Sequence, residues 1–420
     1  MKIAVIGSGI SGLASALILN EKHEVHLFES DERLGGHAHT NQITIEDREF
    51  GVDTGFLVYN DLTYPHLKSL FKYLDVETVA SDMSLSLNIV DQKIEWAGDS
   101  LNTVFAQRKN LFNPKFYKML FDILKFHKEA EALRLESIRQ KWTIGELISH
   151  KSYSRELLEW YILPMVAAIW STPEKGMMDF PAETFLTFFL NHKLLQVNDR
   201  PVWRTVKNGS INYVNKIAAK LKHIHLSEPI TEVLYDDKSL QVQLQSIKGK
   251  YMFDKVIFAT HAPITRKIYK NPSTEQFNML KVFETIPNQA VLHNYEKLMP
   301  KNRSCWASWN VISNLNSKYD DKVSLTYYLN RLQPLPTQKH VLLTLNPAKS
   351  VDHAILTNEY HHPKFDQAAI DSQKLIDGVQ GVNNVYFAGA WTRYGFHEDG
   401  ILSAVKVGEK LGVHPPWTII

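Results

Sequence analysis

Apolar and polar residues alternate in short blocks at the start of the chain. Lys2 to Ile6 is mostly apolar, Ile10 to Asn20 repeats apolar residues as a helix does, and Glu24 to Phe28 is apolar again. Blocks of this length and order predict a strand, a helix and a second strand. The N-terminus is therefore expected to form a parallel βαβ unit.

The turn between the first strand and the helix, Gly7-Ser8-Gly9-Ile10-Ser11-Gly12, has the spacing G-x-G-x-x-G. The first glycine permits a tight turn, the second lets the backbone approach a pyrophosphate, and the third lets the helix pack closely on the strand. The helix N-terminus adds free N–H groups and a positive dipole end. Glu29 stands where a carboxylate binds ribose hydroxyls. This combination predicts a dinucleotide site; the alternative is a glycine-rich helix start without a ligand.

The pattern changes further along the chain. Residues 102–140 and 155–196 are predicted to be mostly helical, because apolar residues recur there at helical spacing. Residues 323–329 and 341–345 are strand-like, and residues 240–253 alternate as a β-hairpin does. The chain therefore mixes α and β elements throughout.

Composition sets limits on the kind of protein. The chain has 420 residues, enough for two or three domains, with 44% apolar and 22% charged residues. Lys and Arg number 47 against 45 Asp and Glu, which gives no reason to expect a nucleic-acid partner. Cys305 is the only cysteine, so no intrachain disulfide can form, and a reducing compartment is expected. The first strand begins at Lys2, so no signal peptide is expected, and a cytoplasmic location follows.

A second glycine pair indicates which dinucleotide is bound. The segment Asp31-Glu32-Arg33-Leu34-Gly35-Gly36-His37 follows Glu29 almost at once. A nicotinamide enzyme usually needs nothing special there. The chain resembles the FAD-dependent amine oxidase and phytoene desaturase superfamily, which has a pattern like R-x-G-G-[RH] at this point. The resemblance implies FAD, with the glycines close to its phosphate and ribitol and His37 in contact with phosphate.

Three later segments carry the same resemblance. In the superfamily a residue like Val233 meets the adenine, the strand before Ala259-Thr260-His261-Ala262-Pro263 returns to the FAD domain, and Gly389 ends the last strand on the phosphate side. A helix starting near Glu398 would present N–H groups to the N1–C2=O edge of the flavin. Many members carry an acidic residue directly after the last glycine, whereas this chain has Ala390-Trp391. The difference removes one expected polar contact to the cofactor and reduces the number of subfamilies to which the chain can belong.

The resemblance implies an α/β fold: a Rossmann-like FAD-binding domain, similar to monoamine oxidase and glutathione reductase, with an inserted α+β substrate domain. The FAD domain is expected in three pieces, residues 1–80, 205–265 and 375–420. The substrate domain is expected from a helical insert, 81–204, and a strand-containing insert, 266–374. The FAD contacts expected are Gly7, Ser8, Gly9, Ile10, Ser11, Gly12, Glu29, Ser30, Arg33, Gly35, Gly36, His37, Thr54, Gly55, Phe56, Val233, Thr260, Gly389, Ala390, Asp399, Gly400 and Ile401.

The segment from Gly389 to Gly400 is the densest candidate for a substrate site. Its aromatic residues Trp391, Tyr394 and Phe396 either wall a pocket beside the flavin or pack the loop between domains. Tyr59 and Trp170 are further pocket candidates, and for each the alternative is a place in the core. No catalytic base can be identified from the sequence; His397 and Tyr394 are the nearest candidates by position.

Two other features concern metal binding and membrane contact. The histidine pairs His37/His39, His223/His225 and His361/His362 have no acidic or cysteine partners at ligand spacing, so no metal site is expected. Residues 111–128 are rich in aromatics and lysines. Such a helix can lie on a membrane surface, here the inner face, or it can be the apolar side of a substrate-domain helix with solvated lysines.

Three blocks resemble one bacterial subgroup of the superfamily: VDTGF-x-VYN-x-x-TYP, SWN…YYLNRLQ and FAGAWTRYGFHEDG-x-x-SAV. Genes of that subgroup commonly lie beside cyclopropane-fatty-acid-synthase-type methyltransferases, and its members are implicated in desaturating methylated acyl chains on the way to furan fatty acids. The resemblance implies a lipid substrate and hydride transfer to flavin N5. Amine oxidation, double-bond isomerisation and a purely structural flavin remain alternatives, and the oligomeric state is left open.

Overall fold

The N-terminal βαβ unit forms as the hydrophobic pattern predicts. β1 (Lys2–Ile6) leads into α1 (Ile10–Leu19), and β2 (Glu24–Phe28) returns parallel to β1. The computed structural model describes residues 1–170, 177–191, 201–313, 324–348 and 350–419. The parts of the sequence predictions that cover 171–176, 192–196 and 323 lie outside these residues.

β1 and β2 belong to a five-stranded parallel sheet with strand order β10-β2-β1-β14-β20. Its other strands are β10 (His223–His225), β14 (Lys255–Phe258) and β20 (Val385–Phe387). The strands β1, β2, β14 and β20 are short runs of mostly buried residues, which suits a parallel sheet covered on both faces, whereas the edge strand β10 is more exposed. The fold class predicted from the sequence, a Rossmann-like domain with an inserted α+β domain, is confirmed.

Alternate residues of these strands enter two separate cores. Val5 and Leu27 pack with α1, α2 (Pro65–Tyr73), α10 (Ile211–Ala218) and α16 (His397–Lys410). Ile6 and Phe28 pack on the opposite face. That face is covered by the antiparallel strands β11 (Ile230–Asp236), β12 (Gln241–Ser246) and β13 (Lys250–Phe253), and by α11 (Ala262–Ile268), α12 (Thr274–Leu280), α14 (Gln367–Gln373) and α15 (Ile376–Val379). The three antiparallel strands are the β-hairpin region expected from the alternation.

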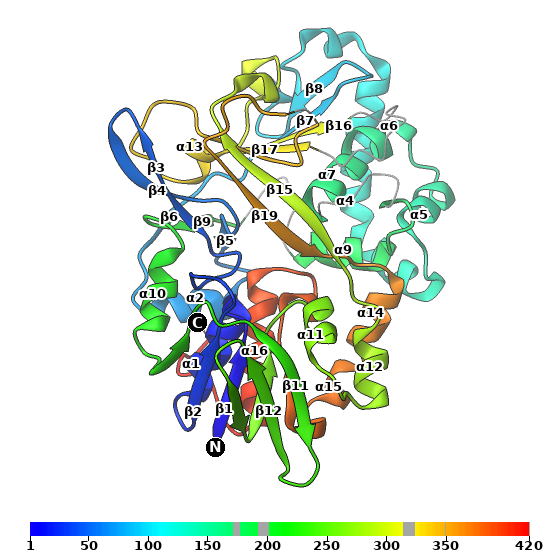
Figure 1. The fold of residues 1–420 in the computed structure, drawn as a ribbon. Coiled ribbons are helices and arrows are strands. Elements are labelled where there is room, and N and C mark those ends of the chain that lie inside the picture. The colour runs from blue at the N-terminus through cyan, green and yellow to red at the C-terminus, as the bar shows by residue number, and fades with distance from the viewer. Residues whose placement is uncertain (171–176, 192–200, 314–323, 349, 420) are drawn as a thin grey trace.

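The second domain lies above the first in Figure 1, and both chain ends marked there lie in the first domain. It contains a seven-stranded sheet of order β19-β15-β18-β17-β16-β7-β8. The strands are β7 (Leu85–Ile89), β8 (Ile94–Ala97), β15 (Thr285–His293), β16 (Trp309–Ser313), β17 (Ser324–Tyr328), β18 (Leu342–Leu345) and β19 (Leu356–Pro363). The strand-like runs predicted near 323–329 and 341–345 correspond to β17 and β18.

Helices cover this sheet and form a large apolar core with it. The helical segments are α3 (Leu101–Val104), α4 (Pro114–Gln140), α5 (Ile144–His150), α6 (Arg155–Leu157), a π-helical turn (Leu158–Ile162), α7 (Leu163–Trp170), α9 (Ala182–Asn191) and α13 (Leu329–Leu332). Short 3-10 turns span Arg108–Phe112, Glu296–Leu298, Arg303–Cys305, Val382–Asn384 and Ala390–Thr392. Within the described helices, none is long and apolar enough to cross a membrane.

Small sheets connect the two domains. β3 (Thr40–Ile45) and β4 (Arg48–Asp53) form a hairpin, and β5 (Tyr59–Asn60), β9 (Trp203–Val206) and β6 (Thr78–Ala80) form a three-stranded sheet. These segments carry the chain out of the first domain and back into it.

Two details of the predicted domain division differ from the structure. The first insert was expected to be helical, yet β7 and β8 from this insert form one edge of the seven-stranded sheet, where β7 pairs with β16. Residues 266–284 were assigned to the substrate domain, yet Met279 and Leu280 of α12 lie in the core under the five-stranded sheet. The local sequence does not show that β7 pairs with β16 or that α12 packs under the five-stranded sheet, because these contacts join segments far apart along the chain.

Candidate functional site

A cavity of about 870 Å³ begins at the carboxyl ends of the parallel strands and continues between the two domains. Gly7 after β1, Glu29 after β2, Thr260 after β14 and Gly389 after β20 all line it. Open α/β sheets bind their ligands at this edge. The cavity is therefore the candidate functional site.

The glycine turn has the backbone geometry that its predicted role requires. Gly7 has φ +98°, and a Cβ there would lie 2.8 Å from the Ala259 carbonyl oxygen. A Cβ on Gly12 would lie 1.8 Å from the Gly7 oxygen, so only glycine lets α1 approach β1 this closely. Gly36, with φ +56°, places its backbone against Gly9, where a Cβ would lie 3.0 Å from the Gly9 Cα. The two glycine segments thus form one backbone cradle.

Helices α1 and α16 present their N-termini to the same cavity. A Cβ on Gly400 would lie 2.8 Å from both Ile10 Cγ2 and Ser11 Oγ, and a Cβ on Gly408 would lie 2.7 Å from Ile18 Cγ2. The contacts advance in the same direction along both helices, so the helices run parallel. Two positive dipole ends therefore face one space, which favours a bound anion such as a pyrophosphate.

Glu29 is held in place at the end of β2. Its Oε2 accepts hydrogen bonds from the Ser8 N–H (2.8 Å) and the Ser8 hydroxyl (2.6 Å). Its Oε1 accepts from the Asp31 N–H (2.9 Å) and the Ser30 hydroxyl (3.1 Å). The two serine hydroxyls can rotate away, which frees acceptor positions for the hydroxyls of a ribose.

Val233, where the adenine contact is expected, does not line the cavity. Val233 is fully buried, pairs with Leu244 within the β11–β12 hairpin, and its carbonyl accepts the Lys270 N–H at 3.0 Å. The cavity is lined instead by residues 228–231, at the start of β11. A register shift between Ile230 and Glu232 marks where the strand leaves the cavity edge. The expectation at Val233 comes from the resemblance to the superfamily, whereas the start of β11 is the part of this strand that borders the cavity.

The other expected FAD contacts divide into two groups. Those that line the cavity are Gly7, Ser8, Gly9, Ile10, Ser11, Glu29, Ser30, Gly36, His37, Gly55, Phe56, Thr260, Gly389 and Ala390. Those that lie behind its wall are Gly12, Arg33, Gly35, Thr54, Asp399, Gly400 and Ile401. Arg33 donates to the Gly36 carbonyl at 2.9 Å and thus shapes the glycine loop. Thr54 turns its hydroxyl to Tyr360, at 2.7 Å, away from the cavity.

Three histidines from different segments meet at the cavity. The His37 ring lies 6.0 Å from His261 and 5.6 Å from His362, between ring centroids. Burial lowers the pKa of His37 well below its usual value and that of His261 to about 4. The His37 and His261 rings are therefore neutral at neutral pH, and a neutral imidazole can still donate one N–H to a phosphate oxygen. The sequence predicted only His37 here.

His397 and Tyr394, the catalytic candidates, both line the cavity. The His397 ring stacks on Phe56 with centroids 3.8 Å apart, and its Nε2 lies 3.2 Å from the Tyr213 hydroxyl. Burial lowers the pKa of His397 to about 3 and raises the pKa of Tyr394. An imidazole with such a low pKa is a weak proton acceptor. His397 is therefore better suited to line the cavity as a neutral ring in a fixed orientation than to act as a base.

The part of the cavity that reaches into the second domain is mostly apolar and aromatic, with Ser84 and His362 as polar lining residues. Its wall contains Met83, Leu85, Met165, Ala168, Ile169, Trp170, Phe188, Trp203, Trp309, Tyr327, Phe365 and Phe396. We call this part the chamber. Among the described lining residues, the carboxylates and the lysine are Glu29, Glu228 and Lys267, and all three belong to the first domain.

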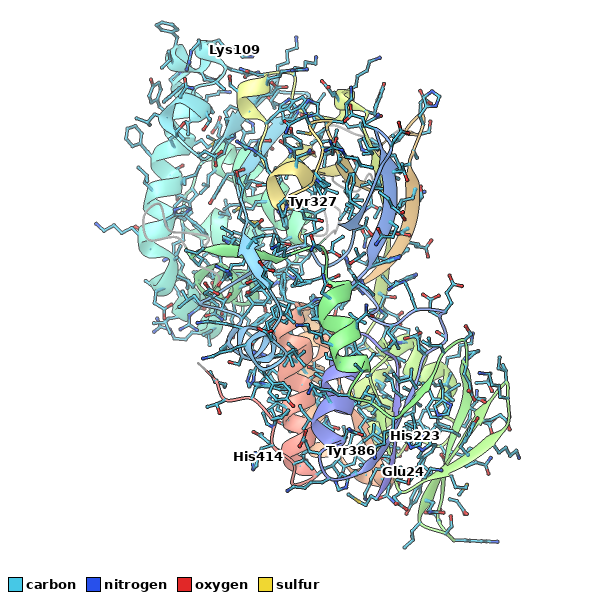
Figure 2. The ribbon with its side chains drawn as sticks, turned by 90° about the vertical axis from the view of Figure 1, so that its left-hand side faces the viewer. Glu24, Lys109, His223, Tyr327, Tyr386 and His414 are labelled. Atoms are coloured by element: carbon cyan, nitrogen blue, oxygen red, sulfur yellow. The ribbon has the colours of Figure 1, made fainter. Side chains whose placement is uncertain are left out.

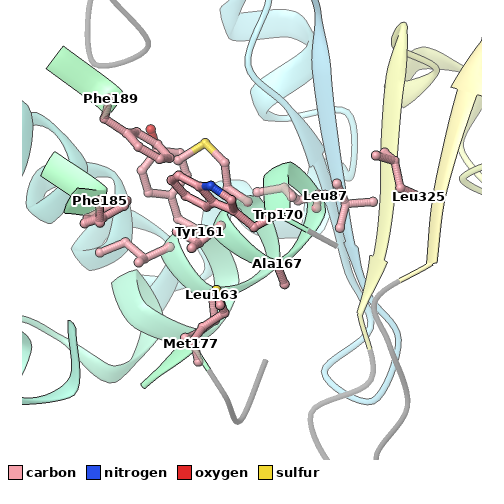
Figure 3. Close-up of a cluster of buried hydrophobic side chains, with 14 of the residues drawn as sticks. Leu87, Tyr161, Leu163, Ala167, Trp170, Met177, Phe185, Phe189 and Leu325 are labelled. Carbon is pink, nitrogen blue, oxygen red and sulfur yellow. The ribbon is translucent and has the colours of Figure 1, made fainter. Parts of the chain in front are cut away.

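Trp170, Trp391, Tyr394 and Phe396 line the cavity as expected, whereas Tyr59 does not. Tyr59 is buried under α2 and β6, where its hydroxyl donates to Thr78 at 3.2 Å. Trp170 also packs in the second-domain core, among the residues of Figure 3. Trp170 therefore both lines the cavity and packs in the core.

Sequence reasoning missed most of the chamber. Phe188 stacks on Phe396 with centroids 4.7 Å apart, and Trp309 from β16 joins the wall. The only available signal was the aromatic content of residues 155–196. Spacing within one segment cannot show which of its faces meets a cavity formed by other segments.

No metal site was expected, because the histidine pairs lack local acidic partners. In the described part of the chain, Glu24, His26 and His223 bring ligand atoms within 4.8 Å of one another on the edge of the five-stranded sheet. The His26 Nε2 and the Glu24 carboxylate already lie at hydrogen-bond distance, 3.0 Å. His26 and Glu24 come from β2 and His223 from β10, so this cluster is separate from the cavity.

A Rossmann-like sheet with a dinucleotide cradle, joined to a second domain that closes an apolar chamber, defines the class of FAD-binding oxidoreductases. Residues 10–410 match the family described as flavin containing amine oxidoreductase, and the chain belongs to this family. It is an FAD-dependent oxidoreductase. No curated protein sequence matches the chain.

Solved structures show the same fold. Putrescine oxidase bound to putrescine is 13% identical, with a TM-score of 0.71 over 98% of this chain and 99% of that chain. Cyclohexylamine oxidase from Brevibacterium oxydans is 13% identical, with a TM-score of 0.68 over 98% and 99%. A CLA-producing fatty acid isomerase from P. acnes is 11% identical, with a TM-score of 0.68 over 98% and 97%. At these identities the similarity establishes the fold alone.

The residues of the cavity fit FAD. A Cβ on Gly9 would meet nothing within 4 Å, so the backbone there faces open space. Two helix N-termini face the place of the pyrophosphate, and Glu29 stands at the place of the ribose. Glu228 to Thr231 would border the adenine, and the parallel α16 would approach the flavin. The flavin would then lie where the first domain meets the chamber.

Proposed function

We propose that the protein dehydrogenates a fatty acyl chain, and that the preferred chain carries a methyl branch. The observation that carries the proposal is the chamber. Its described wall consists of aliphatic and aromatic side chains with few polar atoms, and the lining carboxylates lie only in the first domain. Such a wall suits an acyl chain, since apolar contacts supply most of the binding energy of an apolar ligand.

The reaction removes two hydrogens from adjacent carbons of the acyl chain. One carbon would lose a hydride to FAD, the other would lose a proton to solvent, and the electron pair left behind by the proton would form the carbon–carbon double bond. FAD supplies the hydride acceptor, flavin N5. The protein supplies orientation and exclusion of water: Trp170, Phe188 and Trp309 hold the chain, and the neutral His397 fixes the wall beside the reacting carbons.

The lack of a chamber carboxylate and the closed aromatic pairs of the cavity wall argue against an amine substrate. A substrate ammonium needs a carboxylate or an aromatic cage, and a cage must leave room for the amine between two rings. The stacked pairs at this wall are closed, with centroids 3.8 Å apart for Phe56 and His397 and 4.7 Å apart for Phe188 and Phe396. Neither pair admits a guest between its rings without moving.

Two other functions have their own support. Amine oxidation is favoured by the family and by the putrescine and cyclohexylamine oxidases that share the fold. Double-bond isomerisation, without net oxidation, is favoured by the fatty acid isomerase of the same fold. The three sequence blocks similar to the methyltransferase-linked bacterial subgroup favour a methylated acyl chain over an unbranched one.

The test is a single-turnover reaction without oxygen. Protein loaded with FAD is mixed with methylated phospholipids, unsaturated phospholipids, primary amines and polyamines in turn, while flavin absorbance and product mass are followed. Bleaching by methylated lipid, with a product lighter by two hydrogens, supports desaturation. Bleaching only by amines overturns the proposal in favour of amine oxidation. A shifted double bond with no lasting bleaching overturns it in favour of isomerisation.

A further inference from the structure

Helix α4 carries apolar residues on two faces, and only one of them is needed for the core. Phe116, Met119 and Phe126 are fully buried in the second-domain core. Phe121 and Leu124, on the opposite side, are 68% and 55% exposed. The sequence left open whether this helix faces a membrane or the core. The buried face satisfies the core, so the exposed apolar residues require another explanation.

The exposed apolar residues form a continuous group at the N-terminal half of α4. Tyr117, Phe121 and Leu124 recur at intervals of four and three, which puts them on one side of the helix. Phe112, in the turn just before the helix, is 89% exposed, and Leu111 beside it is 41% exposed. We call these five residues the α4 face. Contiguous exposed apolar groups of this kind usually mark an interaction site.

The segment that carries the α4 face is positively charged. Residues 101–128 contain six Lys and Arg and one carboxylate, a net charge of +5, whereas the whole chain carries +2. The remainder of the chain is therefore net negative. Asp122, the one carboxylate, accepts the Ser154 N–H at 2.9 Å. Of the cations, Lys115 pairs with Glu156 at 3.9 Å, while Lys118 and Lys128 have no ion pair among the described residues.

We propose that the α4 face docks on the surface of an anionic lipid bilayer. Apolar residues on one side with lysines along their border are the features of a helix that lies in the membrane interface. The aromatic rings would enter the acyl boundary while the lysine chains extend to the phosphates. A protein partner would instead have to supply carboxylates for these lysines and arginines or remove their hydration. The occupant is therefore an anionic bilayer, and the inference does not depend on the substrate of the enzyme.

The position of the α4 face allows this docking without covering the FAD domain. Lys109, beside Phe112, lies at the opposite end of the molecule from Glu24 and His223 of the FAD domain (Figure 2). A bilayer at this end would contact the second domain, which contains the chamber.

The test is sedimentation of the FAD-loaded protein with vesicles. Vesicles of phosphatidylglycerol and phosphatidylcholine in equal parts are compared with phosphatidylcholine alone, at low and at high salt. The wild-type protein should bind the anionic vesicles and release them in high salt, which screens the lysines. The double variant Phe112→Ser/Phe121→Ser should lose at least about tenfold in partitioning.

Matched control variants show whether a loss of vesicle binding is specific to the α4 face or follows from any loss of exposed apolar residues or lysines. Ile247→Ser/Phe277→Ser removes two apolar residues, 64% and 47% exposed, from the FAD domain and should change nothing. Lys118→Gln/Lys128→Gln should weaken binding by about fivefold for each lysine, whereas Lys250→Gln/Lys406→Gln should not. FAD content and Tm report that each variant is folded.

Three results would overturn the proposal. The first is that the wild-type protein stays in the supernatant with anionic vesicles. The second is equal binding to both vesicle types at both salt concentrations. The third is a wild-type oligomer that becomes monomeric in Phe112→Ser/Phe121→Ser while vesicle binding is unaffected, since the face would then be a contact between copies of the chain.

Discussion

Gly400 of α16 lies so close to Ser11 of α1 that a Cβ on Gly400 would come within 2.8 Å of the Ser11 Oγ. This contact brings two helix N-termini to the same end of the cavity. A single hydrogen atom at Gly400 thus permits both positive dipole ends to act on one bound cofactor.

The variant Gly400→Ala should therefore weaken FAD binding. The added methyl also meets Ile10 Cγ2 at 2.8 Å, so the helices must separate or shift. Overpacking of this kind costs about 1–3 kcal/mol, which corresponds to roughly tenfold to a hundredfold in affinity where it displaces the site. The measurement is FAD titration of the apoprotein by flavin fluorescence. Gly378→Ala, where a Cβ meets nothing within 4 Å, is the control, and equal affinity in both variants would contradict the argument.

Glu29→Gln tests the ribose contact. The carboxylate receives four hydrogen bonds in the structure, two from Ser8 and one each from Ser30 and Asp31. Hydrogen bonds to a charged group contribute about 1.5–3 kcal/mol, so the affinity for FAD should fall by roughly tenfold to a hundredfold. Isothermal titration of the apoprotein with FAD measures this. Glu32→Gln, an exposed carboxylate of the same loop, should bind FAD like the wild-type protein.

The dinucleotide cradle could be predicted because its signals are local. Gly7, Gly9, Gly12 and Glu29 lie in one βαβ unit; the three glycines have backbone roles that other residue types fill poorly, and Glu29 supplies a side-chain carboxylate. The chamber could not be predicted in the same way. Trp309 reaches it because β16 pairs with β7, aligning Trp309 with Leu85 from a distant part of the chain. Such register is set by tertiary packing, which leaves no local pattern.

The position of Val233 illustrates the same limit on a smaller scale. The resemblance to the superfamily points to Val233, but it does not fix the residue at which this chain leaves the cavity edge. A local register shift after Ile230 decides that, and Val233 faces the core instead. A sequence pattern defines the ends of helices and strands least well, and functional residues often lie at these ends.

Glu398 is expected to make stability depend on pH near neutrality. Its carboxylate accepts the His66 and Leu67 N–H groups at the start of α2, at 2.9 and 3.0 Å. Burial, the largest cause, raises the pKa of Glu398 from 4.5 to about 7. An acid whose pKa is raised on folding contributes stability below the unfolded value, and that stability is lost as pH rises through the folded value. The loss from pH 4.5 to about pH 8 should be on the order of 3 kcal/mol.

Glu398→Gln removes this titration, since an amide does not ionise. The variant loses one acceptor at every pH, but the difference in unfolding free energy, variant minus wild type, should rise from pH 4.5 to about pH 8. Urea denaturation at several pH values measures it. Glu409→Gln, an exposed carboxylate on the same helix, serves as control. A pH-independent difference for Glu398→Gln would show that the carboxylate titrates as it does in the unfolded chain.

Ala168→Leu tests whether the chamber holds the acyl chain. Ala168 lies on α7, is 5% exposed and lines the chamber, so a larger side chain there takes space that a long substrate needs. Turnover of long acyl chains should fall by at least about tenfold, while shorter chains lose less, because the unfavourable contact affects only a chain that reaches α7. The flavin spectrum and FAD affinity should not change, since Ala168 belongs to the second domain. Reduced FAD binding would mean that the substitution disturbed the cofactor site. Unchanged turnover of long chains, with the cofactor site intact, would show that the substrate does not extend along α7.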